Sequence, residues 1–106
     1  MSALRILIVD DEPPARQRLT DLIGREPDAV VIGEVATGTA AVARIQEEQP
    51  DVVFLDVQMP GLTGLDVVRE IGAEAMPAVV FVTAYDRHAV EAFELAALDY
   101  LLKPYS

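Results

Sequence analysis

The sequence predicts a single α/β domain built around a parallel β-sheet. Short apolar runs rich in β-branched residues alternate, along 106 residues, with segments whose apolar side chains recur at helical spacing. Hydrophobic residues make up 52% of the chain, which suits a sheet buried on both faces. No repeat or low-complexity segment interrupts the alternation. Strands that alternate with helices form βαβ units, which require parallel pairing and right-handed crossovers.

The N-terminal part of the chain predicts a strand followed by a helix. The apolar run over residues 4–9 is typical of a buried strand, and it stops at the acidic residues 10–12. Pro13 and Pro14 suit the first turn of a helix, where their missing N–H donors are not needed. Gly24 marks the end of that helix.

A second strand and a second helix come next. Residues 30–35 form the strand, and the charge of Glu34 indicates a position near an edge of the sheet. Residues 37–39 offer caps for the helix, and Pro50 closes it.

The third strand, residues 52–56, ends at a carboxylate. Its apolar run stops abruptly at Asp56, and Pro60 and Gly61 then form a turn. Taken alone, Asp56 fits a solvated aspartate that ends a strand, because Asp is a common turn former. The polar residues that end the other strands change this interpretation.

The remaining sequence predicts two more helices and two more strands. A helix opens at residues 63–64, a strand covers 78–82, a helix covers 86–97 and a strand covers 98–102. The last strand is the more polar one, so we expect it at an edge of the sheet. Thr83 follows the first of these strands and Lys103 follows the second.

The polar strand ends should meet at one rim of the sheet, where open α/β domains bind their ligands. The residues expected there are Asp10, Asp11, Glu12, Asp56, Thr83 and Lys103. Two carboxylates about 4 Å apart repel by roughly 4 kcal/mol at a surface-like dielectric, so the three aspartates require a cation. Oxygen ligands without a Cys or His cluster favour Mg²⁺.

The same set of residues suits phosphoryl transfer. A carboxylate can act as the nucleophile and form an acyl phosphate, and Asp56 is the candidate. The metal would neutralise charge on the transferring group. Lys103 would pair with one phosphoryl oxygen, and the Thr83 hydroxyl would donate a hydrogen bond to another.

Charge and composition narrow the range of partners. The net charge of −10, from 18 acidic and 8 basic residues, argues against a nucleic-acid surface on this chain and favours cations and basic protein surfaces. The absence of cysteine excludes disulfides and thiolate metal sites. No apolar run is long enough for a signal peptide or a membrane span, so we expect no membrane partner and a cytoplasmic location.

Four motifs together resemble the receiver domains of bacterial two-component response regulators. They are residues 8–12, 55–61, 82–84 and 99–104, read as IVDDE, LDVQMPG, VTA and DYLLKP. The resemblance covers essentially the whole chain. It implies a flavodoxin-like (CheY-like) sheet of five parallel strands in the order 2-1-3-4-5, an order that belongs to the family and is not worked out from the residues.

The resemblance also implies roles for the rim residues. Asp56 would accept a phosphoryl group from a sensor histidine kinase. Asp11 and Asp56 would bind Mg²⁺ (or Mn²⁺) together with the backbone carbonyl of Gln58, and Asp10 would help directly or through water. A receiver catalyses only its own phosphorylation and dephosphorylation, so we do not expect an enzyme that acts on other substrates.

A conformational switch is implied as well. Thr83 and Tyr100 resemble the family's hydroxyl and aromatic pair, in which the hydroxyl moves toward the phosphoryl group and the ring turns inward. The readout would be the face of the fourth helix and fifth strand, where Tyr85 and His88 lie. We expect Tyr85 to slow self-dephosphorylation by obstructing the attacking water.

Three stretches resemble receivers joined to a LytTR-type (LytR/AlgR) DNA-binding domain. They are residues 84–86, 91–94 and 97–105. Residues 1–106 would then be a receiver domain truncated at its C-terminus, and an absent output domain would bind DNA and regulate transcription. The fifth helix of receivers would be missing too, so we expect a homodimer or an element-swapped oligomer to cover the exposed apolar face.

Three alternatives to a phosphoacceptor remain. A haloacid-dehalogenase-like phosphatase would place a second Asp two residues after Asp56, where this chain has Gln58. A flavodoxin-like cofactor binder would need a Gly- or Ser/Thr-rich phosphate loop, whereas residues 10–14 would repel phosphate. A receiver-like interaction scaffold that is never phosphorylated is the strongest rival, and the combination of Asp56, Thr83 and Lys103 argues against it.

Overall fold

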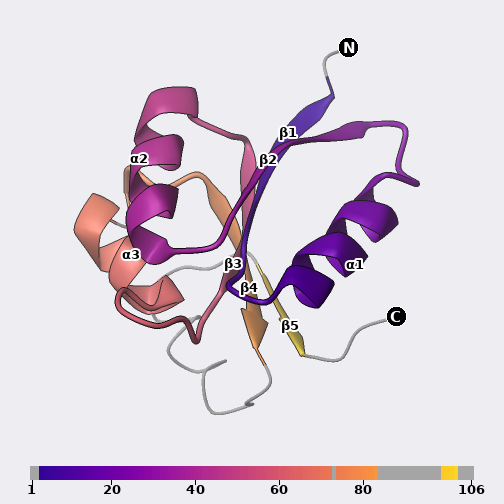
Figure 1. The fold of residues 1–106 in the computed structure, drawn as a ribbon. Helices are drawn as coiled ribbons and strands as arrows, with labels where there is room; N and C mark the ends of the chain where they lie inside the picture. Colours follow the sequence, from indigo (N-terminus) through magenta and orange to yellow (C-terminus); the bar gives the residue numbers. More distant parts are fainter. Residues whose placement is uncertain (1–2, 73, 84–98, 103–106) are drawn as a thin grey trace.

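A computed structural model of the chain describes residues 3–72, 74–83 and 99–102. The described elements alternate between strands and helices, as Figure 1 shows. They are β1 (Leu4–Val9), α1 (Pro13–Ile23), β2 (Ala29–Val35), α2 (Gly38–Glu48), β3 (Val52–Asp56), α3 (Gly64–Ile71), β4 (Ala78–Thr83) and β5 (Asp99–Leu102). The helix predicted over residues 86–97 lies outside the described residues.

The five strands form one parallel sheet in the order β2-β1-β3-β4-β5. This confirms the flavodoxin-like order that the family resemblance implies. It also confirms the two predicted edge positions, that of β2, which carries Glu34, and that of β5, the last and more polar strand. The central neighbours β1 and β3 pair from Ile6 opposite Val52 to Val9 opposite Leu55, so the residues that follow these two strands begin side by side.

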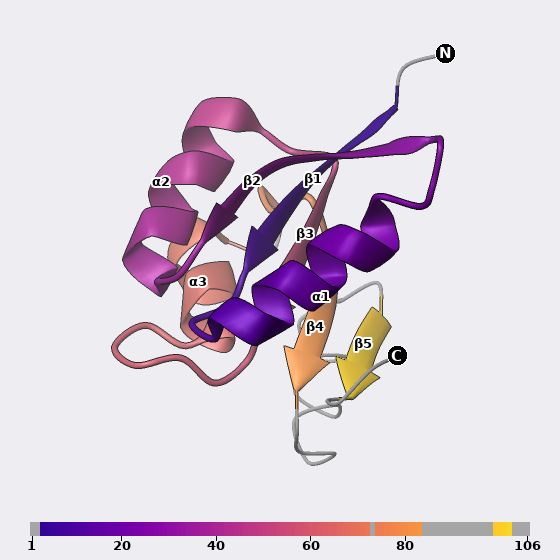
Figure 2. The ribbon, with the colours of Figure 1, turned by 45° about the vertical axis from the view of Figure 1, so that its right-hand side comes forward.

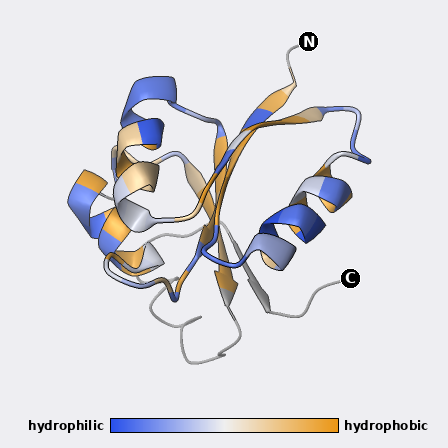
Figure 3. Cartoon of the chain, in the orientation of Figure 1, coloured by the Kyte–Doolittle hydropathy of each residue, from blue (hydrophilic) through white to orange (hydrophobic). Residues whose placement is uncertain are grey.

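The sheet is the middle layer of the molecule. Figures 1 and 2 show α2 and α3 on one side of it and α1 on the other. Side chains alternate along β1 between two clusters, since Leu7 and Val9 pack with α2 and α3 while Ile6 and Ile8 pack with α1. The apolar colour of the strands in Figure 3, against the mixed colour of the helices, reflects this burial.

The two faces of the sheet are covered unequally by the described elements. On the side of α2 and α3 the largest buried side chain is that of Phe81, which is 0% exposed. On the side of α1, Val52 and Phe54 are only partly buried. The expected self-association through an exposed apolar face stays a prediction.

Threonine side chains cap the N-termini of α2 and α3. Thr37 accepts a hydrogen bond from the Ala40 amide at 3.1 Å. Thr63 and Asp66 form a reciprocal capping box, in which the Asp66 amide donates to Thr63 Oγ1 at 3.1 Å and the Thr63 amide donates to Asp66 Oδ2 at 3.0 Å. The hydrogen bonds from Thr63, helped by the nearby charge of Arg69, hold the pKa of Asp66 below its usual range.

Arg5, near the N-terminal end of β1, forms hydrogen bonds to the C-terminus of α2. Its Nη1 donates to the carbonyl oxygens of Glu48 at 2.8 Å and Gln49 at 3.1 Å, and its amide donates to the Asp51 carboxylate at 2.8 Å. Gln49 has the left-handed conformation (φ 46°) that ends the helix. These bonds satisfy carbonyls that a helix end leaves without a partner inside the helix.

Candidate functional site

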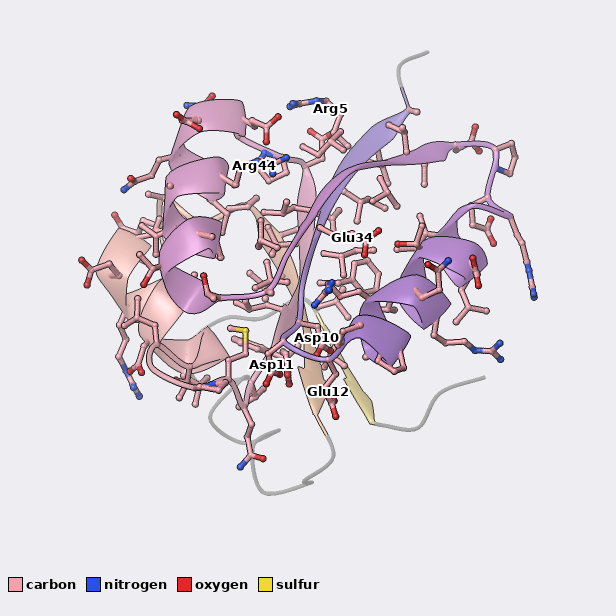
Figure 4. The ribbon with its side chains drawn as sticks, viewed as in Figure 1. Arg5, Asp10, Asp11, Glu12, Glu34 and Arg44 are labelled. Atoms are coloured by element: carbon pink, nitrogen blue, oxygen red, sulfur yellow. The ribbon has the colours of Figure 1, made fainter. Side chains whose placement is uncertain are left out.

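The candidate site lies at the C-terminal ends of β1 and β3. The carboxylate oxygens of Asp10, Asp11 and Asp56 lie within 4.8 Å of one another. Asp10 is 0% exposed and Asp56 3% exposed, while Asp11 is half-buried. Figure 4 shows Asp10, Asp11 and Glu12 together where β1 ends. The structure thus brings together the three aspartates that the sequence places at one rim.

Asp10 is held through both its backbone and its side chain. Its amide donates to the carbonyl of Val35 on β2 at 3.1 Å. Its Oδ1 accepts a hydrogen bond from the Glu12 amide at 2.9 Å, and its own carbonyl accepts one from Arg16 Nη1 at 2.8 Å. Asp10, the first residue after β1, therefore has a fixed orientation.

Asp56 is fixed by the turn that follows it. Its Oδ1 accepts a hydrogen bond from the Gln58 amide at 3.2 Å. Val57 continues the sheet by donating to the Val82 carbonyl at 3.0 Å, and its own carbonyl accepts from the Gly64 amide at 3.0 Å. The loop between β3 and α3 is thus tied to both the sheet and the start of the helix.

Gly64 allows α3 to begin directly against the backbone of Asp56. A Cβ at Gly64 would collide with the Asp56 carbonyl oxygen and lie 3.0 Å from its carbonyl carbon and 3.1 Å from Val57 Cα. These neighbours are all main-chain atoms, two of the candidate nucleophile Asp56 and one of the residue after it. The position therefore requires a residue without a side chain.

The donor set fits a hard divalent cation. Each of the three residues offers a carboxylate oxygen, and neither sulfur nor imidazole belongs to this group. Three carboxylates this close repel one another, and oxygen-only ligand sets suit Mg²⁺ or Mn²⁺. Gln58, whose backbone carbonyl is the fourth expected ligand, is exposed and follows Asp56 by two residues.

The other predicted site residues are described only in part. β4 ends at Thr83, whose backbone pairs with that of Leu102, and Tyr100 pairs with Phe81. Because Asp56 pairs with Val82, the backbone of Thr83 lies one residue beyond the level of Asp56 on the neighbouring strand. Lys103, Tyr85 and His88 lie outside the described residues, so their roles stay predictions.

Two residues near the site were not identified from the sequence. The sequence predicts Gly64 only as part of a helix start, and the Thr-Gly pair that follows Asp56 is the one signal of a tight approach. Nothing local in the sequence assigns Arg16 to the site, although it is one of only eight basic residues and follows Glu12 by one helical turn. Its contact with Asp10 depends on tertiary structure.

No helix within residues 3–72, 74–83 and 99–102 combines the length and the apolar character needed to cross a membrane. A model of the response regulator receiver domain family matches residues 6–106.

Curated relatives match almost the whole chain. A response regulatory protein of Vibrio vulnificus is 52% identical over 101 residues, which are 95% of this chain and 42% of that protein. The transcriptional regulatory protein BtsR of Escherichia coli is 43% identical over 101 residues, which are again 95% of this chain and 42% of that protein. This chain therefore spans less than half the length of these relatives.

Solved structures share the fold closely. The response regulatory domain of mrkE from Klebsiella pneumoniae has a TM-score of 0.88 and 38% identity, covering 97% of this chain and 85% of that one. The response regulator domain of Thermotoga maritima CheB has a TM-score of 0.89 and 32% identity, covering 98% and 81%. A DNA-binding response regulator of the LuxR family from Staphylococcus aureus has a TM-score of 0.86 and 31% identity, covering 97% and 88%.

Proposed function

The chain belongs to the family of response regulator receiver domains, and from this membership we propose that it is a Mg²⁺-dependent phosphoacceptor whose acceptor residue is Asp56. The phosphoryl donor would be a sensor histidine kinase. One observation carries the proposal: the carboxylates of Asp10, Asp11 and Asp56 gather within 4.8 Å at the ends of two adjacent parallel strands. A scaffold that never binds a cation has no need to hold three carboxylates so close.

Asp56 would act as the nucleophile. The Gln58 amide orients its carboxylate, and the surrounding sheet excludes most solvent from it. A carboxylate oxygen of Asp56 forms a bond to phosphorus while the bond between phosphorus and a nitrogen of the donor's imidazole breaks, and the electron pair stays on that nitrogen. With a proton on the other ring nitrogen of the donor, the products are an acyl phosphate on Asp56 and a neutral histidine on the kinase.

The neighbouring residues would stabilise charge during the transfer. A divalent cation held by Asp10, Asp11 and Asp56, with the Gln58 carbonyl, would offset the negative charge of the phosphoryl oxygens. Lys103 and the Thr83 hydroxyl would bind other phosphoryl oxygens, as the sequence predicts. In this proposal the chain catalyses only its own phosphorylation and dephosphorylation.

The switch pair Thr83 and Tyr100 would pass the signal to an output domain through the face of the fourth helix and fifth strand. BtsR relatives are named as transcriptional regulators, which supports transcription as the output. The sequence motifs in the C-terminal part favour a LytTR-type DNA-binding domain, whereas the solved structures include LuxR-family regulators. The type of output domain stays a prediction from those motifs.

The direct test is phosphoryl incorporation. Wild type, Asp56→Asn and the control Asp28→Asn, which changes an exposed aspartate in the turn before β2, are incubated with acetyl phosphate with and without Mg²⁺. Intact mass should increase by one phosphoryl group for wild type and Asp28→Asn with Mg²⁺ only. Incorporation into Asp56→Asn would refute the assignment of the acceptor, and no incorporation into any variant, together with no binding of beryllofluoride, would favour the scaffold alternative.

A further inference from the structure

A single arginine joins the loop of the acidic site to the first helix. Arg16 lies one turn into α1, and its Nη1 donates to the Asp10 carbonyl at 2.8 Å. That carbonyl belongs to the planar peptide unit between Asp10 and Asp11. The Asp10 amide is already fixed by Val35. Holding the carbonyl as well sets the plane from which the side chain of Asp11 projects.

Arg16 is itself held in place from the edge of the sheet. Glu34 on β2 lies 3.6 Å from Arg16 Nε through its Oε1, and its Oε2 accepts a hydrogen bond from Thr20 Oγ1 at 3.1 Å. Arg16 and Thr20 are one helical turn apart, so both face the same strand. Figure 4 shows Glu34 between β2 and α1.

Arg16 can affect cation binding in two ways, through its positive charge and through the backbone that it holds. A positive side chain near a cation site weakens cation binding by repulsion, so removing only its charge would strengthen binding. Arg16 is paired with Glu34, however, and their side chains are 21% and 36% exposed, which reduces the net field of the pair. The main effect of Arg16 on the site is therefore to orient the peptide between Asp10 and Asp11.

We propose that Arg16, braced by Glu34 and Thr20, is a positioning residue for divalent cation binding at Asp10, Asp11 and Asp56. The inference rests on the proposed function, because it concerns the same cation. Arg16 acts through the Asp10 carbonyl and does not touch the cation. It makes the loop after β1 a preorganised part of the site, so that less ordering accompanies binding.

The test is the Mg²⁺ affinity of the protein, measured without phosphorylation. Amide chemical shifts of ¹⁵N-labelled protein are followed as MgCl₂ is added at constant ionic strength. Residues that orient metal ligands typically change affinity about 10- to 100-fold, and because Arg16 acts on a ligand's backbone we expect about tenfold weaker binding for Arg16→Ala. Arg16→Lys keeps the positive charge but lacks the planar guanidinium that meets both the Asp10 carbonyl and Glu34. Its Mg²⁺ affinity should therefore lie between those of wild type and Arg16→Ala.

Arg5 provides a matched control at the opposite end of the sheet. It also donates to backbone carbonyls, those of Glu48 and Gln49, so Arg5→Ala should destabilise the fold without changing Mg²⁺ affinity. Arg25→Ala removes one exposed positive charge and should leave the affinity unchanged. Glu34→Gln is the second test variant, should Arg16→Ala fold poorly, and because Arg16 keeps its bond to the Asp10 carbonyl we expect it to weaken binding less than Arg16→Ala does.

The outcomes separate the two proposals. Weaker binding in Arg16→Ala and Glu34→Gln but not in Arg5→Ala or Arg25→Ala supports the positioning role. Unchanged or tighter binding in Arg16→Ala, with binding abolished in Asp11→Asn, would overturn the role of Arg16 and leave the proposed function standing. No Mg²⁺-dependent shift in wild type, or an unaffected Asp11→Asn, would overturn both.

Discussion

The close contact between Gly64 and the backbone of Asp56 allows the effect of a single methyl group to be worked out. In Gly64→Ala the new Cβ would overlap the Asp56 carbonyl oxygen and crowd two further main-chain atoms. Main-chain atoms in a paired strand cannot rotate away, so overpacking should cost about 3 kcal/mol, the upper end of the usual range. The helix propensity gained by replacing glycine returns at most about 1 kcal/mol. The net loss in the free energy of unfolding is therefore about 2 kcal/mol.

The assay is urea unfolding of the two glycine variants Gly64→Ala and Gly33→Ala. A Cβ at Gly33 would meet only the guanidinium end of Arg44, a flexible side chain that can move aside. With a slope of about 2 kcal/mol per molar urea, the midpoint of Gly64→Ala should fall by roughly 1 M, while that of Gly33→Ala should stay near wild type. Gly64→Ala should also incorporate less phosphoryl group, since Asp56 must shift. Equal midpoints for the two variants would refute the reasoning.

Three further predictions concern single side chains. Thr63→Ala should lower the free energy of unfolding by about 1 kcal/mol at neutral pH, because the Asp66 amide loses its acceptor. The variant keeps the backbone amide that donates to the Asp66 carboxylate and is the main cause of its depressed pKa, so the stability from that bond, present above the unfolded pKa, is lost from both proteins as pH falls through the folded value, and the difference between their urea midpoints should persist in acid. Arg5→Ala should cost about 1 to 2 kcal/mol in the same assay, because the carbonyls at the end of α2 lose a charged donor. Tyr85→Ala should hasten loss of the phosphoryl group from Asp56, followed by intact mass over time, and an unchanged rate would contradict the shielding role of Tyr85.

The order of elements could be predicted from the sequence because it depends on local pattern. Apolar runs that stop at polar residues predict strands, and parallel connection then places all the strand ends at one rim. Asp10, Asp11 and Asp56 are separated by up to 46 positions, yet this argument was enough to bring them together. The strand order came from the resemblance to receivers and not from the pattern.

Contacts between side chains of different elements could not be predicted in the same way. The pairing of Arg16 with Glu34 depends on which turn of α1 faces β2, and the chain offers many other partners for either charge. The approach of Gly64 to Asp56 depends on the exact path of the loop between them. By contrast, the start of α3 at Thr63 was predictable, since its cap is formed by residues only three positions apart.

The crowding of the three carboxylates has a consequence for stability as well as for chemistry. Asp11 lies within 4.8 Å of two other carboxylates. A pair of charges at this separation repels by roughly 3 kcal/mol at an effective dielectric of about 20 and by roughly 1 kcal/mol in bulk water. Asp11 is half-buried, so we expect Asp11→Asn to stabilise the metal-free protein by about 1 to 2 kcal/mol.

Excess Mg²⁺ should make wild type more stable than Asp11→Asn. Ligand at 100 times its dissociation constant stabilises a folded protein by about 2.7 kcal/mol, a gain that wild type should show and Asp11→Asn should lack. Thermal unfolding in EDTA and in excess MgCl₂ measures both effects, with Asp28→Asn as a control for the loss of one exposed negative charge. If Asp11→Asn is less stable than wild type in EDTA, the carboxylates do not repel as argued. If wild type gains nothing from Mg²⁺, the cation is not what the cluster holds.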